Sequence, residues 1–203
     1  MDTDRAKLVV EAEVRNRLIA ECIQSVNDYL HGRAWEIFSN KFKSMNINLP
    51  RDLIACKICE EPMTGHYFEK EKKIIICANN VVNQEFDSTL GHEMVHLFDD
   101  ARAEVDFHNP EHVACSEIRA TNLSGECSNK GFLKHVRKGT VTKKYTQCVK
   151  DRATKSLMDN PHFKLKNMME AEEIVGGVWD VCFYDYEPFS IDEAKRKAAG
   201  KKF

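Results

Sequence analysis

The sequence predicts an α+β fold in which several helices surround a small β-sheet. Apolar residues recur at helical spacing in most segments of the chain, which favours amphipathic helices. Residues 63–78 instead contain two β-prone stretches joined by a polar connection, the pattern of a β-hairpin. The helical segment that follows, 84–101, carries two histidines four residues apart. These observations together predict a small sheet packed against a histidine-bearing helix.

The expected elements follow from hydrophobic spacing and from helix-start and turn signals. Asp4 is a suitable N-cap for the first helix, and residues 46–52, which include Pro50, form a linker. The hairpin places Tyr67 in one arm and residues 74–77 in the other. Helices are expected over 4–30, 33–45, 84–101, 111–122, 145–159 and 168–177, and in the tail from Ile191 onward.

The composition is ordinary for a globular domain, since 42% of the 203 residues are hydrophobic, 31% are charged and the net charge is −2. The longest aliphatic run, 74–76, is far shorter than the ~20 residues that a membrane-spanning helix needs. The first residues are acidic, so we expect neither a secretory signal nor a matrix-type presequence. The protein is therefore expected in the cytosol or nucleus, or to be imported without a cleavable presequence.

Eight cysteines stand in contrast to this missing secretion signal. In a reducing compartment so many cysteines indicate a metal site, whereas in an oxidising compartment they indicate disulfides. Cys56 and Cys59 form a CxxC pair, but neither a second such pair nor a βαβ context is present, which argues against a zinc ribbon or a redox motif. Structural disulfides are therefore favoured, with the pairing left open.

His92, Glu93 and His96 form an HExxH motif. Residues four apart share one face of a helix, so His92 and His96 can bind one Zn²⁺, which accepts imidazole nitrogens at about 2.0–2.1 Å. Glu93 lies about 100° around the helix from His92, where it reaches a water on the metal and can take its proton. Gly91, just before the motif, permits close approach of a substrate or another backbone. The motif predicts zinc-dependent peptide hydrolysis with Glu93 as general base.

A catalytic zinc needs a third protein ligand and one open position. Arg102 occupies the place of the third histidine of the metzincins, which excludes that class. Glu117, in the expected helix 111–122, resembles the glutamate that a second helix supplies in gluzincins, and we choose it as third ligand. The rivals are Asp99, Asp100, His108 and His112. Asp99 or Asp100 could instead orient an imidazole.

The segment from Lys130 to Lys155 carries nine basic residues and a single acid, Asp151. This basic segment is interpreted either as an exposed, solvated face or as a surface that contacts anionic lipid head groups. The bases are Lys130, Lys134, Arg137, Lys138, Lys143, Lys144, Lys150, Arg152 and Lys155.

Four short stretches, in this order, resemble a known family. They are GHEMVHLFD (91–99), CSEIRA (115–120), NLSGEC (122–127) and the stretch 182–189. The family is that of the mitochondrial inner membrane metalloproteases that act in ATP synthase assembly, and the likeness covers roughly residues 45–190. It implies His92 and His96 as metal ligands and Glu93 as catalyst, and it leaves the third ligand unsettled.

The resemblance also implies a location, a substrate and a domain division. Such proteins are peripheral on the intermembrane-space side of the mitochondrial inner membrane and contain disulfides. In fungi they cut the N-terminal extension of ATP synthase subunit six and assist its assembly. We therefore expect a zincin-like, gluzincin-type metallopeptidase domain over 49–190, preceded by a helical segment over 1–48 and followed by a basic tail over 191–203.

The expected partners are a polypeptide substrate, with subunit six as the candidate, and the anionic inner membrane, with no nucleic acid. The alternative function is a catalysis-independent assembly chaperone or an interaction protein built on a zincin scaffold. The strand Lys73–Cys77 is expected at the sheet edge, where an extended substrate could pair with it.

Overall fold

The computed structural model describes residues 2–82, 84–128 and 143–198, which form a mixed α+β fold of three strands and seven helices. The predicted α+β class is confirmed. The helices are α1 (Asp2–Leu30), α2 (Arg33–Ser44), α3 (Phe86–Arg102), α4 (Pro110–Ser124), α5 (Lys143–Asp159), α6 (Met168–Phe183) and α7 (Ile191–Ala198). The strands are β1 (Ile54–Lys57), β2 (Gly65–Phe68) and β3 (Lys73–Cys77). None of the described helices is long and apolar enough to cross a bilayer.

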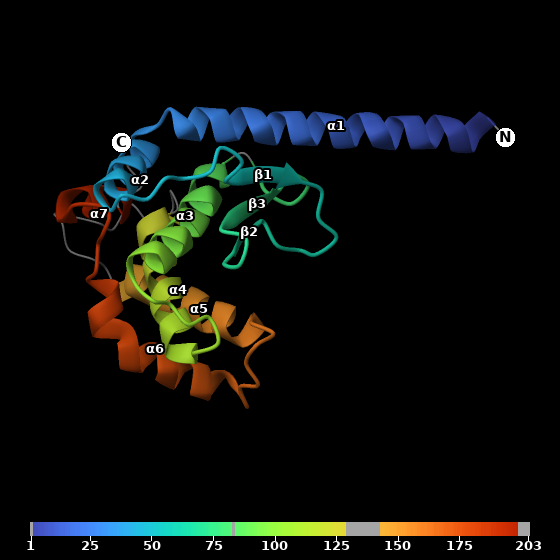
Figure 1. Ribbon diagram of the computed structural model, residues 1–203. Helices are drawn as coiled ribbons and strands as arrows, with labels where there is room; N and C mark the ends of the chain where they lie inside the picture. The colour runs from blue at the N-terminus through green and yellow to red at the C-terminus, as the bar shows by residue number, and fades with distance from the viewer. Residues whose placement is uncertain (1, 83, 129–142, 199–203) are drawn as a thin grey trace.

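The sheet has the order β1-β3-β2, with β2 antiparallel and β1 parallel to β3. The predicted hairpin is confirmed, and its register pairs Tyr67 with Ile74. The parallel strand β1 was not predicted. Because β3 is paired on both sides, the expectation that Lys73–Cys77 is an edge strand is wrong. The edge beside α3 is β2, which packs on that helix (Figure 1).

The core consists of two clusters of buried side chains. One lies between the sheet, α1, α2 and α3 and contains Phe38, Met94 and Phe98. The other lies between α4, α5 and α6 and contains Ile118 and Leu157. In Figure 1, α3 and α4 run between the sheet and the α5–α6 pair, and the N-terminal half of α1 extends beyond the rest of the molecule. The pair α3–α4 is therefore the contact between the two cores.

Helix α6 continues to Phe183, six residues past its predicted end. The prediction ended it at the glycine pair 176–177, and each glycine disfavours a helix interior by about 1 kcal/mol relative to alanine. The continuation buries Cys182 and Phe183 in the second core. Tertiary packing therefore outweighs the local helix propensity.

All eight cysteines form disulfides, which confirms the prediction that Cys56 and Cys59 take part in structural bridges. The two residues bond different partners, so they do not form a redox pair. The bridges are Cys22–Cys56, Cys59–Cys77, Cys115–Cys182 and Cys127–Cys148. The last two tie α4 and the turn after it to α6 and α5.

Part of the predicted basic segment lies on α5, which carries Lys143, Lys144, Lys150, Arg152 and Lys155. Lys130, Lys134, Arg137 and Lys138 lie outside the described residues.

Candidate metal centre

His92 and His96 lie one turn apart on α3, and Glu117 faces them from α4. The Nε2 atom of His92 lies 3.4 Å from Glu117 Oε2, and Nε2 of His96 lies 3.6 Å from Glu117 Oε1. The three ligand atoms all lie within 4.8 Å of one another. Among the described residues this is the only group of three or more His, Cys, Asp or Glu side chains with such spacing. The three residues chosen from the sequence are therefore brought together.

The dimensions of this group suit zinc. Four ligands at zinc bond lengths in a tetrahedron lie about 3.3 Å from one another. The two measured nitrogen–oxygen distances, 3.4 and 3.6 Å, are close to that value. In addition, Glu117 Oε2 is buried and has no hydrogen-bond partner among the described residues. A buried carboxylate oxygen without a donor is destabilising unless a cation satisfies it.

The ring of His96 is held through Ser116. The Ser116 hydroxyl lies 2.8 Å from His96 Nδ1 and donates to Asp99 Oδ2 at 3.2 Å. Because that hydroxyl donates to Asp99, it accepts from Nδ1–H of His96, which leaves the lone pair of Nε2 directed toward Glu117. Asp99 therefore orients the imidazole of His96, as considered from the sequence, but it does so indirectly through the hydroxyl of Ser116.

Asp99 is in turn paired with Arg119, a buried arginine that is only 1% exposed. Arg119 Nε donates to both carboxylate oxygens of Asp99, at 2.9 and 3.0 Å, and its other nitrogens bind the loop at Asp185 and Glu187. Arg102 contacts Asp99 and Asp185 as well. Sequence reasoning did not assign a role to Arg119 or Ser116. The signal available was their position beside Glu117 in the stretch 115–120.

The ring of His92 lies against Glu126, which follows the end of α4. His92 Nδ1 lies 2.7 Å from Glu126 Oε1, and the second oxygen of Glu126 accepts from Arg152 Nη1 at 2.9 Å. Burial alone would lower the pKa of His92, but the charges of Glu126 and Glu117 raise it well above its ordinary value. The surroundings of His92 therefore favour a positive charge, whether a proton or a metal ion supplies it.

Glu93 is 7% exposed and lies beside the histidines against the edge strand β2. Burial raises its pKa to about 7, against the lowering effects of His92 and of a hydrogen bond from the Tyr67 backbone. A Cβ atom at Gly65 would lie 3.3 Å from Glu93 Cγ and 3.0 Å from Thr89 Cγ2. A glycine at position 65 therefore lets β2 approach the glutamate closely.

The remaining ionisable groups of the centre show opposite shifts. Burial lowers the pKa of His96 to about 4. Burial would raise the pKa of Glu117, but His96, His92 and a hydrogen bond from Ser156 lower it to about 2. These directions favour an anionic Glu117 and a neutral His96, the protonation states in which these two residues can bind a divalent metal. These groups line a cleft of about 620 Å³ between β2, α3, α4 and α5.

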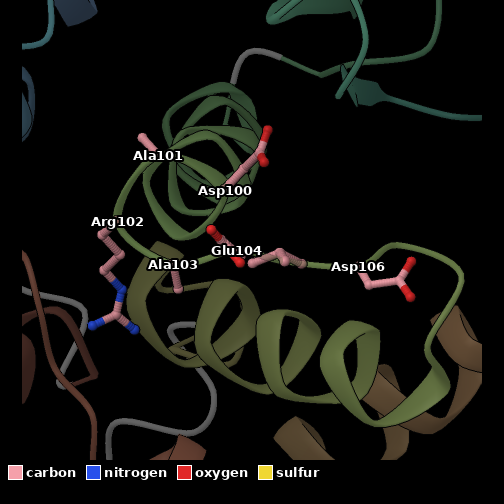
Figure 2. A pocket seen from close by; sticks show the side chains of 7 residues that line it. Asp100, Ala101, Arg102, Ala103, Glu104 and Asp106 are labelled. Atoms are coloured by element: carbon pink, nitrogen blue, oxygen red, sulfur yellow. The ribbon is translucent and has the colours of Figure 1, made fainter.

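The rival third ligands lie elsewhere. A second pocket, with a volume of about 540 Å³, lies around residues 100–106 at the end of α3. Figure 2 shows that the side chains of Asp100 and Arg102 point to opposite sides there. Asp100 accepts hydrogen bonds from Tyr67 and Lys72. His112 Nδ1 accepts from the backbone of Asp106, and the ring of His108 packs against His162. None of these rivals belongs to the His92–His96–Glu117 group.

Gly91 faces α4 rather than the cleft. A Cβ atom there would lie 3.6 Å from the Cα atom of Ser124. Of the two roles considered for this glycine, close approach of another backbone fits the observed contact.

Comparison with known proteins identifies similar chains. The model of the peptidase M76 family matches residues 20–190. The chain is 42% identical over 149 residues to mitochondrial inner membrane protease atp23 of Schizosaccharomyces pombe, covering 71% of this chain and 77% of that relative. It is 34% identical over 196 residues to mitochondrial inner membrane protease ATP23 of Candida albicans, with coverages of 90% and 80%. The match to the Eremothecium gossypii protein of that name, 42% identical over 138 residues, covers 67% of this chain and 55% of the relative. No solved structure matches the chain significantly.

Proposed function

Because the chain belongs to the peptidase M76 family, a family of metallopeptidases, we propose that it is a zinc-dependent endopeptidase with a zincin-like, gluzincin-type site. Zn²⁺ is held by His92, His96 and Glu117, and Glu93 is the general base. The observation that carries this proposal is the convergence of two imidazole nitrogens and one carboxylate at zinc-like separations, 3.4 and 3.6 Å.

The chemistry of this chain's residues follows from their surroundings. When bound, zinc would supply positive charge that polarises the scissile carbonyl and acidifies water. Glu93, whose pKa is raised to about 7 by burial, accepts the proton of the attacking water and passes it to the leaving amine. Strand β2 lies close to Glu93 at Gly65 and Tyr67, so its backbone limits the space in which the Glu93 side chain can move.

An extended substrate would pair with β2 rather than with β3. Cys77 N donates to Thr64 O, so the antiparallel alternation turns the backbone groups of Gly65 and Tyr67 away from β3 and toward the cleft. A peptide lying along this edge passes beside Glu93. Methylating the backbone nitrogens next to the scissile bond of a peptide substrate should block its cleavage, and normal cleavage of the methylated peptide would contradict this docking.

Two variants test the centre. Glu93→Gln should abolish peptide cleavage and retain zinc, whereas Glu117→Ala should lose zinc on metal analysis. Glu111→Ala, on the exposed first turn of α4, is the matched control and should change neither. Stoichiometric zinc in Glu117→Ala would refute the third ligand. Cleavage by Glu93→Gln would refute the general base.

We further propose that the protein acts at the mitochondrial inner membrane, as the names of its relatives state for them, on the intermembrane-space side. Its substrate there is ATP synthase subunit six. The four disulfides support an oxidising compartment. Protein taken from cells under acid quench should show no free thiols, and eight free thiols would contradict this location. If ATP synthase assembly survives in Glu93→Gln, the chaperone alternative is favoured over proteolysis.

Peripheral membrane contact is proposed for the basic start of α5, where Lys143 and Lys144 are exposed. Attraction to anionic head groups falls with salt. Binding to vesicles that contain anionic lipid should therefore be strong at low salt and weak at high salt. Absence of binding at low salt would refute this contact.

A further inference from the structure

Glu126 lies in a turn that directs it back toward α3. Helix α4 ends at Ser124 and is capped by Gly125, whose φ of 88° is in the left-handed region that favours glycine. The turn is held by hydrogen bonds from Glu126 N to Ser124 Oγ and from Ser128 Oγ to Gly125 O. The Glu126 side chain is 15% exposed and reaches His92. The turn therefore places a carboxylate behind the ring of a proposed metal ligand.

The two oxygens of Glu126 have different partners. Oε1 lies 2.7 Å from His92 Nδ1, and Oε2 accepts from Arg152 at 2.9 Å. Nδ1 lies on the opposite side of the imidazole from Nε2, the atom that faces Glu117. Glu126 is therefore not placed to bind the same ion as His92 Nε2. Its Oε1 lies at ion-pair distance from Nδ1, a buried atom that makes no aligned hydrogen bond to any described residue, so this carboxylate is the polar contact on that side of the ring.

Helix α5 braces this arrangement through three residues at successive spacings of four, which lie on one helical face. Cys148 forms a disulfide with Cys127, the residue after Glu126. Arg152 binds Glu126, and Ser156 lies beside Glu117, where it helps to lower the pKa of that carboxylate. One stripe of α5 therefore contacts the turn after α4, the partner of one histidine and the carboxylate of the metal group.

We infer that Glu126 is a positioning residue for His92, held in place by Arg152 and by the Cys127–Cys148 disulfide. The inference deepens the proposed zinc site and rests on it. Partners that orient a metal-bound histidine typically contribute 10–100-fold to metal affinity or activity. The turn after α4 and helix α5 thus set how tightly the centre binds zinc, although neither provides His92 itself.

The first experiment compares Glu126→Ala, Glu126→Gln and a control, Glu173→Ala, which changes an exposed acid on α6. Zinc affinity is measured by chelator competition, and ring geometry by the visible spectrum of the cobalt(II)-substituted protein. Glu126→Ala should lose about 10–100-fold in zinc affinity with an altered cobalt spectrum. Glu126→Gln keeps an oxygen acceptor and should recover most of the affinity. Glu173→Ala should match the wild type.

The outcomes separate this inference from the proposed function. Wild-type protein that binds no zinc would overturn both. Zinc binding by the wild type with unchanged affinity and cobalt spectrum in Glu126→Ala would overturn the inference alone. An equal loss in Glu126→Gln and Glu126→Ala would also overturn it, because a positioning role requires that the retained acceptor restores binding.

The second experiment tests the brace by removing one disulfide at a time through paired Cys→Ser changes. Cys127–Cys148 joins residues 21 apart in sequence, and the control, Cys22–Cys56, joins residues 34 apart on α1 and β1, away from the cleft. Both removals should lower the thermal midpoint. Only removal of Cys127–Cys148 should lower zinc affinity, and equal affinities in the two variants would overturn the role of the brace.

Discussion

His92 and His96 lie one turn apart on the same helix, yet they are supported from two different regions of the molecule. His96 is held by the neutral hydroxyl of Ser116, behind which lies the buried Asp99–Arg119 pair. His92 is held by the carboxylate of Glu126, whose other partner is the exposed Arg152. One support belongs to the contact between α3 and α4, and the other lies at the end of α4 and on α5.

The two histidines therefore differ in whether the residues that contact their rings can be changed without unfolding the protein. Arg119 joins α3, α4 and the loop at Asp185, so the support of His96 is also part of what holds the two cores together. Arg152 is 55% exposed on its side chain, and its partner Glu126 belongs to a turn tied by a disulfide. We therefore expect changes near His96 to affect stability first, and changes near His92 to affect metal binding first.

The largest expected effect on stability comes from Arg119→Met. The change leaves the carboxylate of Asp99 buried without its main partner, and breaking a buried ion pair in this way is destabilising by about 3–5 kcal/mol. Urea unfolding at neutral pH measures the loss, with Arg51→Met, an exposed arginine before β1, as control. A loss below about 1 kcal/mol would contradict the structural weight given to this pair.

Ser116→Ala removes the hydroxyl between His96 and Asp99. The ring of His96 loses its acceptor, and we expect zinc affinity to fall by about 10–100-fold. Stability should fall as well, by about 1–3 kcal/mol, because Asp99 loses a hydrogen-bond donor in a buried place. Chelator competition and urea unfolding measure the two quantities. Ser44→Ala, on the exposed end of α2, is the control, and unchanged zinc affinity in Ser116→Ala would count against the relay.

Acid should lower the stability of the region that supports His96, because Asp185 is paired there with Arg102 and Arg119. Partial burial alone would raise the pKa of Asp185, but a hydrogen bond from Arg102 and the charges of Arg119 and Arg102 lower it. A carboxylate whose pKa is lowered by folding stabilises the protein above its unfolded pKa, and this contribution is lost as the pH falls through the folded pKa. Asp185→Asn should therefore lose about 1–3 kcal/mol at pH 7 and less at pH 3, which lies below the ordinary pKa of aspartate. Urea unfolding of the metal-free protein at both pH values measures this, and a loss that does not depend on pH would contradict it.

The sequence sufficed for features that depend on local spacing. The two histidines and Glu93 are set by one turn of helix, and the hairpin by its β-prone arms. Glu117 could be chosen because it lies in the next amphipathic helix, and the structure brings it to the two histidines. Local spacing therefore sufficed to choose the three residues that converge in the folded chain.

Features that depend on contacts between distant segments could not be predicted. Strand β1 pairs directly with β3, although β2 lies between them in the sequence. Its four residues show little local pattern that would predict a strand. The supports of the two histidines come from α4, α5 and the turn between them, which only folding brings to α3. Glu126 was present in the stretch 122–127 that carried the family resemblance, but nothing in the sequence placed it against Nδ1 of His92.

The smallest expected change in stability, and the sharpest test of the comparison, comes from Arg152→Met. Arg152 pairs with Glu126 as Arg119 pairs with Asp99, but it is exposed, so its loss should change the free energy of unfolding by less than about 1 kcal/mol. Zinc affinity should nevertheless fall by several-fold, because Glu126 loses the partner that holds its second oxygen. Arg119→Met measured in parallel should show the opposite pattern. Its free energy of unfolding should fall strongly, whereas the zinc affinity of the protein that remains folded should change less than in Arg152→Met. If Arg152→Met lowered stability as much as Arg119→Met, the two supports would not differ in kind, and the division between a structural side and a metal-tuning side of the centre would be wrong.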